Sequence, residues 1–241
     1  MFNMFYIQVI CMRTDTLKFR HELKYYITEA DYLTLRARLR NVAKPDPYAD
    51  ADGKYTIRSL YFETPMDKTL QEKLTGVMNR EKFRIRMYNT DDSFIRLEKK
   101  MKLNLATSKV SSPLSRNETD LILANKIDWM KDSDRDLLKE LYTKMKYQQL
   151  RPKTVVEYTR ECFIYKPGNV RVSIDSEIKT GITGTKFFDA DLPTAKTFGI
   201  PVIIMEIKYD NFLPSIIKAM VQLPNRKVTA FSKYAAARIF G

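Results

Sequence analysis

Charged and apolar residues alternate with a period of two in at least five segments of this chain. Such alternation indicates a β-strand, because successive side chains of a strand point to opposite faces of the sheet. In KFRIRMY (82–88) the cations Lys82, Arg84 and Arg86 share one face, and the apolar residues between them share the other. A chain with this pattern is predicted to form a sheet with one face on an apolar core and a second face rich in charge.

The same division of faces recurs in the segments 18–27, 94–100, 170–175 and 202–209, whereas in 155–164 Tyr158 and Arg160 lie on a face that is otherwise apolar. For any one strand, a solvated polar face is the ordinary explanation. The strands together show repeated Arg-x-Arg and Glu-x-Lys pairs, which a closed antiparallel barrel with a charged interior explains better. Capping residues predict helices after Thr28, Thr64, Ser115 and Ser133, and two more near 214–223 and 231–240. The predicted class is therefore α+β, an antiparallel closed β-barrel with helices packed outside.

The net charge of +13, from 42 Lys and Arg against 29 Asp and Glu, predicts an anionic partner. Nucleic acid, an anionic membrane and phosphorylated small molecules all satisfy that requirement. Two cysteines and one histidine are too few for a disulfide framework or a Cys/His zinc site. The apolar segment 1–16 is too short to span a bilayer and lacks the features of an export signal, so we treat it as an N-terminal extension. The chain is expected to be soluble and cytoplasmic, with one domain over residues 17–241.

Arginine and lysine side chains that line a closed lumen would repel one another unless bound anions or nearby carboxylates neutralise their charge. Arginine binds phosphate oxygens through two parallel hydrogen bonds, and lysine adds a mobile charge. A linear polyphosphate is thin and charged along its length, so it suits such a lumen. The carboxylates Glu22, Glu98 and Glu206 have two roles open to them, either salt bridges to the cations or ligation of a divalent metal.

Several runs in one order carry a family resemblance: FRHELKYYI, YTIRSLYFET, NREKFRIRMYN, IRLEKK, RPKTVVEYTRE, NVRVSID, IMEIKYDNFLP and AFSKYAAAR. Together they resemble the polyphosphate polymerase domain of the vacuolar transporter chaperone (VTC) family. That family is similar to the triphosphate tunnel metalloenzymes, also called CYTH-like proteins. The resemblance covers nearly the whole chain from about Leu17.

The resemblance implies a tunnel of about eight antiparallel strands that transfers the terminal phosphate of ATP to a growing polyphosphate chain, with Mn²⁺ or Mg²⁺ as cofactor. ATP and inorganic polyphosphate would be the partners. The matching positions imply a catalytic phosphate clamp of Lys24, Arg84, Arg86, Arg160 and Arg171. They also imply further phosphate ligands at Lys100, Lys208, Ser232 and Lys233, and at Lys109 in the loop after the Glu-x-Lys strand. Glu206 matches the metal glutamate, and Glu22 and Glu98 are additional candidate ligands.

Two positions depart from the patterns of these families. Ala230 replaces the first lysine of a Lys-Phe-Ser-Lys motif, and Arg226 or Lys227 is a candidate substitute. Arg20 replaces the first glutamate of the Glu-x-Glu-x-Lys strand of the related triphosphatases. The presence of Arg20 favours a tunnel that binds phosphate through cations over the hydrolase type, whose tunnel is richer in carboxylates.

Three functional classes therefore remain open. They are a metal-dependent polyphosphate polymerase, a triphosphatase with the same tunnel, and a non-catalytic protein that binds polyphosphate or inositol phosphates. Nucleic acid is not an expected partner, because the charged strand faces lack aromatic stacking platforms. No segment is long enough to span a membrane, so coupling to export would need a separate membrane partner.

Overall fold

A computed structural model describes residues 20–104, 106–181, 186–197 and 201–240 of the chain. The predicted extension 1–16 lies outside the described residues. The strands are β1 (His21–Ile27), β2 (Lys44–Pro45), β3 (Lys54–Glu63), β4 (Arg80–Tyr88), β5 (Asp91–Leu103), β6 (Ala106–Leu114), β7 (Arg151–Tyr165), β8 (Val170–Gly181), β9 (Thr194–Lys196) and β10 (Ile203–Tyr209). The α-helices are α2 (Glu29–Arg40), α3 (Lys68–Leu74), α4 (Arg116–Leu123), α5 (Asp136–Tyr147), α6 (Ser215–Val221) and α7 (Lys233–Phe240), and short 3-10 helices span Asp128–Asp132 and Pro167–Asn169.

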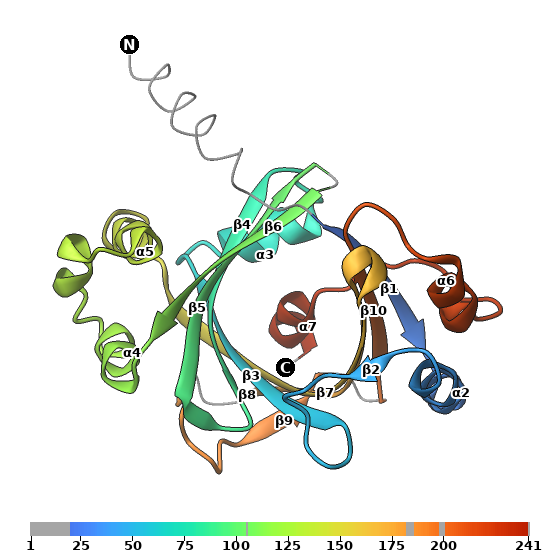
Figure 1. Cartoon of the computed structure of the whole chain (residues 1–241). Helices are drawn as coiled ribbons and strands as arrows, with labels where there is room; N and C mark the ends of the chain where they lie inside the picture. Colours follow the sequence, from blue (N-terminus) through green and yellow to red (C-terminus); the bar gives the residue numbers. More distant parts are fainter. Residues whose placement is uncertain (1–19, 105, 182–185, 198–200, 241) are drawn as a thin grey trace.

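The strands form one antiparallel sheet that curls around a central space (Figure 1). The order along the sheet is β1-β10-β8-β7-β3-β4-β5-β6, with β2 and β9 added beside β7 and β8. All six predicted strands are present. Lys109, expected in a loop, lies instead in β6, where it is the cross-strand partner of Lys100.

The prediction of a closed barrel is wrong, because the sheet is an open half-barrel. Among the described residues, its end strands are joined by an isolated bridge between Arg20, just before β1, and Thr107 of β6. The free edge of β1 is taken by the segment before α7. The amide of Thr229 donates to the carbonyl of Lys24 at 2.8 Å, and Tyr25 forms a bridge with Val228. These hydrogen bonds occupy the edge that β6 would need for closure.

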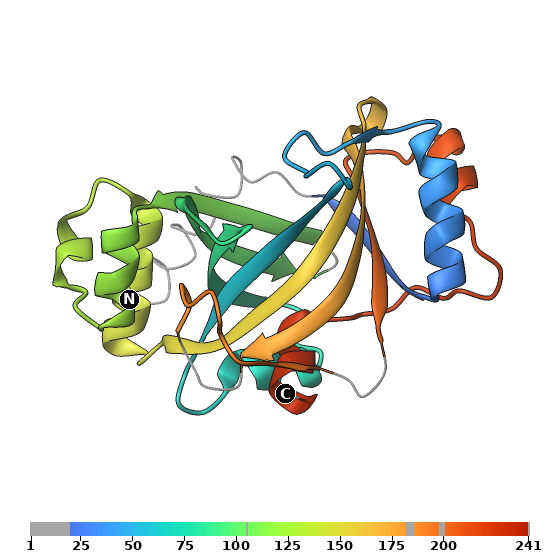
Figure 2. The ribbon, with the colours of Figure 1, turned by 90° about the horizontal axis from the view of Figure 1, so that it is seen from below.

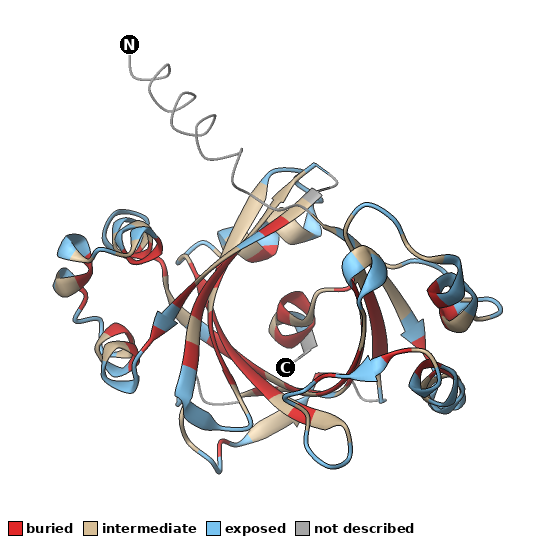
Figure 3. Ribbon diagram, in the orientation of Figure 1, coloured by how far each residue is buried: buried red, intermediate tan, exposed pale blue. Residues whose placement is uncertain are grey.

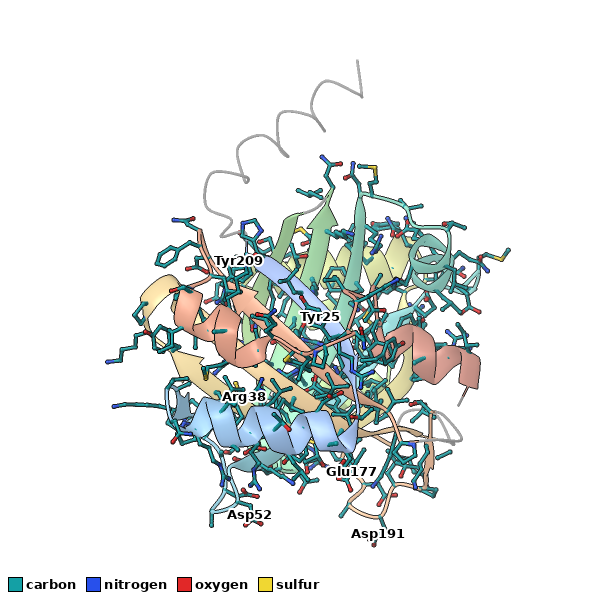
Figure 4. All side chains as sticks on the ribbon, turned by 90° about the vertical axis from the view of Figure 1, so that its right-hand side faces the viewer. Tyr25, Arg38, Asp52, Glu177, Asp191 and Tyr209 are labelled. Carbon is teal, nitrogen blue, oxygen red and sulfur yellow. The ribbon has the colours of Figure 1, made fainter. Side chains whose placement is uncertain are left out.

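Helices cover the convex face on two flanks, as expected. Figure 4 shows α2 and α6 side by side on one flank, where Leu35, Leu39 and Ile217 are buried in a core with the apolar face of β8 and β10. On the opposite flank α4 and α5 pack against the apolar face of β3, β4 and β5.

Local capping explains the starts of α2 and α4, whereas α5, expected after Ser133, begins at Asp136 without a side-chain cap. Thr28 and Ser115 form complete capping boxes with Asp31 and Glu118. At the start of α3 the hydroxyl of Thr64 accepts from the amide of Lys68 at 3.1 Å, as predicted, and the buried carboxylate of Glu63, which was not predicted, accepts from the amides of residues 69 and 70.

The last helix, α7, does not pack outside, which corrects the second part of the prediction. Figures 1 and 2 place it within the curl of the sheet, beside α3 at one end. Its small residues Ala235, Ala236 and Ala237 permit close approach to the concave face, where they are buried with Tyr158 and Ile57. Figure 3 shows that the strands around this space are largely buried. The concave face is therefore part core and part site.

Candidate functional site

The concave face brings most of the predicted residues together, in three groups of ion pairs. Members of the predicted set that belong to these groups are Glu22, Lys24, Arg84, Arg86, Glu98, Lys100, Lys109, Arg160, Glu206, Lys208 and Lys233. Strand alternation placed the strand residues of this set on the charged face, except Lys109, which was expected in a loop, and Arg160, which was expected on an otherwise apolar face. The spatial grouping depends on pairing between strands that are distant in sequence.

The first group surrounds Glu98, which is only 2% exposed. Arg84, its cross-strand neighbour, donates from Nε at 2.7 Å, and Lys109 donates from Nζ at 2.9 Å. Arg86 Nη1 lies 3.7 Å away. Burial alone would raise the pKa of Glu98, but Arg84, Arg86 and Lys109 hold it well below its usual range. Glu98 is therefore a fixed negative charge that balances the arginine pair.

The second group joins β1, β10 and β5 through two carboxylates. Glu22 accepts from Lys24 and from Lys100, each at 2.7 Å. Glu206 lies 3.3 Å from Lys208 Nζ and 3.6 Å from Lys24 Nζ, so it shares Lys24 with Glu22. Burial lowers the pKa of Lys208 to about 8, although both carboxylates oppose that shift. Two carboxylates and three lysines thus meet at one point of the concave face.

The third group centres on Asp175, which the sequence analysis did not select. Asp175 is fully buried and accepts from Arg160 Nε and Nη2 at 2.6 and 2.8 Å. Lys233, at the start of α7, donates to the same carboxylate at 2.5 Å and lies 4.6 Å from the centre of the Tyr158 ring. Asp175 falls on the charged face of NVRVSID. Its position in the strand alternation could therefore have identified it as a residue of the charged face. Arg160 Nη2 is also 3.5 Å from Glu206, which links this group to the second.

Two predicted residues lie apart from these groups. Arg171 is 39% exposed in its side chain and binds Asp46 at 2.7 Å. Ser232 accepts a hydrogen bond from the amide of Ala235 at 3.3 Å in the first turn of α7.

The position of the missing lysine, Ala230, has a cationic neighbour that the sequence did not indicate. Lys73, from α3, donates to the carbonyl of Ala230 at 2.8 Å. Arg226, one of the two predicted substitutes, is instead paired with Asp31 at 2.6 Å. A cation from a distant helix therefore lies beside the backbone at this position.

A pocket of about 240 Å³ opens on the concave face between β1, β4, β5, α3 and the segment before α7. Its cationic lining is Lys24, Lys73, Arg80, Lys82, Lys100 and Lys102. Of its two carboxylates, Glu81 is already paired with Lys99 and Lys144. Such an excess of positive charge suits a ligand with several negative charges.

Glu22 and Glu206 fit a hard divalent cation, because Mg²⁺ in phosphate sites is held by one or two carboxylates together with phosphate oxygens. Glu98 belongs to a different group and is held by Arg84 and Lys109. The described ranges contain no cluster of three or more His, Cys, Asp or Glu side chains arranged for a metal ion. Any metal here would need ligand oxygens from a phosphate substrate.

Comparison with known proteins supports the family expectation. The sequence model of the VTC domain matches residues 19–239. A search of curated proteins finds no match. In the helices that the structure describes, none has the length and apolar character needed to cross a membrane.

Solved structures with the same fold include two proteins described as putative cyclases. One, from Hippeastrum, is described as having a dominant triphosphatase activity. It has 13% identity and a TM-score of 0.54 over 91% of this chain and 95% of its own. The other is a putative adenylate cyclase from Bacillus halodurans, with 14% identity and a TM-score of 0.51 over 80% of this chain and 81% of its own. At these identities the likeness shows the fold.

Proposed function

Because the chain belongs to the VTC domain family, we propose that it is a metal-dependent polyphosphate polymerase, which transfers the terminal phosphate of ATP to inorganic polyphosphate. The observation that carries this proposal is the convergence of Arg84, Arg86 and Arg160 on one concave face beside a cation-lined pocket. A linear phosphate chain supplies negative charge along its whole length, which matches this distribution. The tunnel-fold protein from Hippeastrum with a triphosphatase activity adds support for phosphate chemistry on this fold.

Phosphoryl transfer needs positioning and charge stabilisation more than covalent help from the protein. Arg84 and Arg86 project from neighbouring positions of β4 and are braced by Glu98, Tyr61 and Tyr158. Because these guanidinium groups are held in place before substrate arrives, little reorganisation is needed when charge develops on the transferring phosphate. The attacking oxygen of a phosphate acceptor is already anionic at neutral pH, so the reaction requires no protein base.

Lysines of the second group would neutralise the leaving diphosphate. Lys24, Lys100 and Lys208 share the two carboxylates Glu22 and Glu206, so the positive charge of the three lysines is only partly compensated before substrate enters. Arg171, at the exposed end of β8, would contact the part of the chain outside the pocket. Ser232 and Lys233 would hold a phosphate against the first turn of α7.

Glu22 and Glu206 are the residues that would hold Mn²⁺ or Mg²⁺. A bound cation supplies charge neutralisation by contacting phosphate oxygens. We assign Glu98 to charge balance of the arginine pair instead of metal ligation, because it is a single carboxylate among Arg84, Arg86 and Lys109, whereas Glu22 and Glu206 are two carboxylates of one group.

The test is incubation of the purified protein with ATP and Mn²⁺ or Mg²⁺, with products separated by gel electrophoresis and identified by phosphorus NMR. Phosphate chains should appear with the wild type and be absent with Arg84→Ala. A matched control is Arg116→Ala, which removes an exposed arginine paired with Asp120 on the convex side. Release of orthophosphate without chains would identify a triphosphatase, and binding of tripolyphosphate without turnover would identify a non-catalytic phosphate-binding protein.

A further inference from the structure

Lys82 is a concave-face cation to which the proposed mechanism assigns no role. In the described part of the chain it forms no ion pair with a carboxylate, and its ammonium lies 5.4 Å from the centre of the Tyr61 ring. Its cross-strand neighbour is Lys100, itself a cation. The other charged groups that line the same pocket are Lys24 and Glu22 on β1, Arg80 and Glu81 on β4, Lys102 on β5 and Lys73 on α3. Lys82 therefore lies in an uncompensated positive region.

Tyr61, on β3, lies between Lys82 and the arginine pair. It is 3% exposed, and its hydroxyl accepts a hydrogen bond from Arg84 Nη1 at 3.0 Å. Its ring packs against Tyr234 of α7 at 5.1 Å between centroids. The charged groups that act on it are Arg84, Lys82 and Arg86. Tyr61 thus fixes one arm of Arg84 and is held in turn by the C-terminal helix.

The surroundings shift the pKa values of Lys82 and Tyr61 toward neutral pH. Burial lowers the pKa of Lys82 to about 7, and Lys100, Arg84 and Lys24 act in the same direction. Burial would raise the pKa of Tyr61, but Arg84, Lys82 and Arg86 outweigh it and lower the pKa to about 7. Each charged form favours the other, so in the absence of ligand the pair titrates as a unit that shares about one proton.

We propose that Lys82 is an additional anion-binding residue of the concave face, that Tyr61 positions Arg84 beside it, and that this pair takes up one proton from water when a phosphate chain binds. The negative charge of the ligand favours both the ammonium form of Lys82 and the neutral hydroxyl of Tyr61. The proton therefore adds either to the phenolate oxygen or to the neutral amine, and no other bond changes. The inference rests on the proposed function only for the substrate class.

The test is titration calorimetry of the metal-free protein with sodium tripolyphosphate near neutral pH, in buffers of different ionisation enthalpy. Wild type should take up about 0.5 to 1 more proton per ligand than the double variant Tyr61→Phe/Lys82→Arg, which keeps the cation but has neither titrating group. Protons taken up by the ligand and by Lys208 occur in both proteins, so they cancel in the difference. Affinity of the wild type should also fall more steeply with rising pH.

A spectroscopic measurement on the wild type needs no variant. Near-ultraviolet absorbance should show a tyrosinate that forms near neutral pH and disappears when tripolyphosphate is added. This signal should be missing from Tyr61→Phe.

Direct binding by Lys82 is tested separately. Lys82→Met should weaken tripolyphosphate binding by about tenfold, because a charge-assisted contact is lost, and Lys82→Arg should restore it. Lys102→Arg, at a lysine of the same pocket, is the control and should leave the linked proton uptake unchanged. Equal proton uptake by wild type and double variant would overturn this inference alone. Failure of tripolyphosphate to bind the wild type would overturn both this inference and the proposed function.

Discussion

Asp175 offers the sharpest test of how the concave face is stabilised, through the substitution Asp175→Asn. The carboxylate is fully buried and binds Arg160 at 2.6 and 2.8 Å and Lys233 at 2.5 Å. Asparagine keeps the shape but removes the carboxylate that binds both cations, and leaves Arg160 with only the more distant Glu206 at 3.5 Å. Removing one partner of a buried ion pair costs about 3–5 kcal/mol. Since domains of this kind are stable by about 5–15 kcal/mol, the variant should lose a large part of its free energy of unfolding.

Tripolyphosphate should reverse much of this loss, because the ligand would replace the missing negative charge. Binding at a concentration 100 times Kd adds about 2.7 kcal/mol of stability. Asp175 no longer competes with the ligand for Arg160 and Lys233 in the variant, so the variant should gain more from the ligand than the wild type does.

The assay is urea unfolding, followed by circular dichroism with and without tripolyphosphate. Asp120→Asn, which breaks an exposed pair with Arg116, is the control and should change stability by less than about 0.5 kcal/mol. A loss below about 1 kcal/mol for Asp175→Asn, or a ligand effect no larger than that on the wild type, would refute the reasoning.

Three further predictions follow from the same contacts. Burial would raise the pKa of Asp175, but Arg160 and Lys233 lower it to about 2 from an ordinary value of 3.8. The pKa of Asp175 is lower in the folded state than in the unfolded state, so its ionised form stabilises the fold by about 2 kcal/mol. This stabilisation should be present above pH 3.8 and lost as the pH falls toward 2. The acid unfolding curves of the wild type and Asp175→Asn should therefore converge near pH 2. Glu206→Gln should abolish metal-dependent turnover of ATP. Binding of tripolyphosphate without metal, measured by calorimetry, should persist or tighten. Unchanged turnover would argue against Glu206 as a metal ligand. Lys73→Ala should weaken tripolyphosphate binding about fivefold, or about 1 kcal/mol, whereas Lys68→Ala on the same helix should not.

Residue alternation determined which side chains share a face, because the period of two is a property of each strand alone. Arg84, Arg86 and Glu206 were assigned correctly to the charged face for this reason. Capping boxes at Thr28 and Ser115 were equally readable, since each depends on residues only three positions apart. The family resemblance, carried by ordered motifs, was confirmed by the match over residues 19–239.

Tertiary structure alone decided how those faces close and which charges meet. The half-barrel stays open because a C-terminal segment hydrogen-bonds to the edge of β1, a contact between residues that are some 200 positions apart in sequence. The same long-range packing brings Lys73 to Ala230 and Lys233 to Asp175. No local sequence pattern predicts these contacts, because they depend on how separate elements pack together. The charge balance of the site follows from that packing.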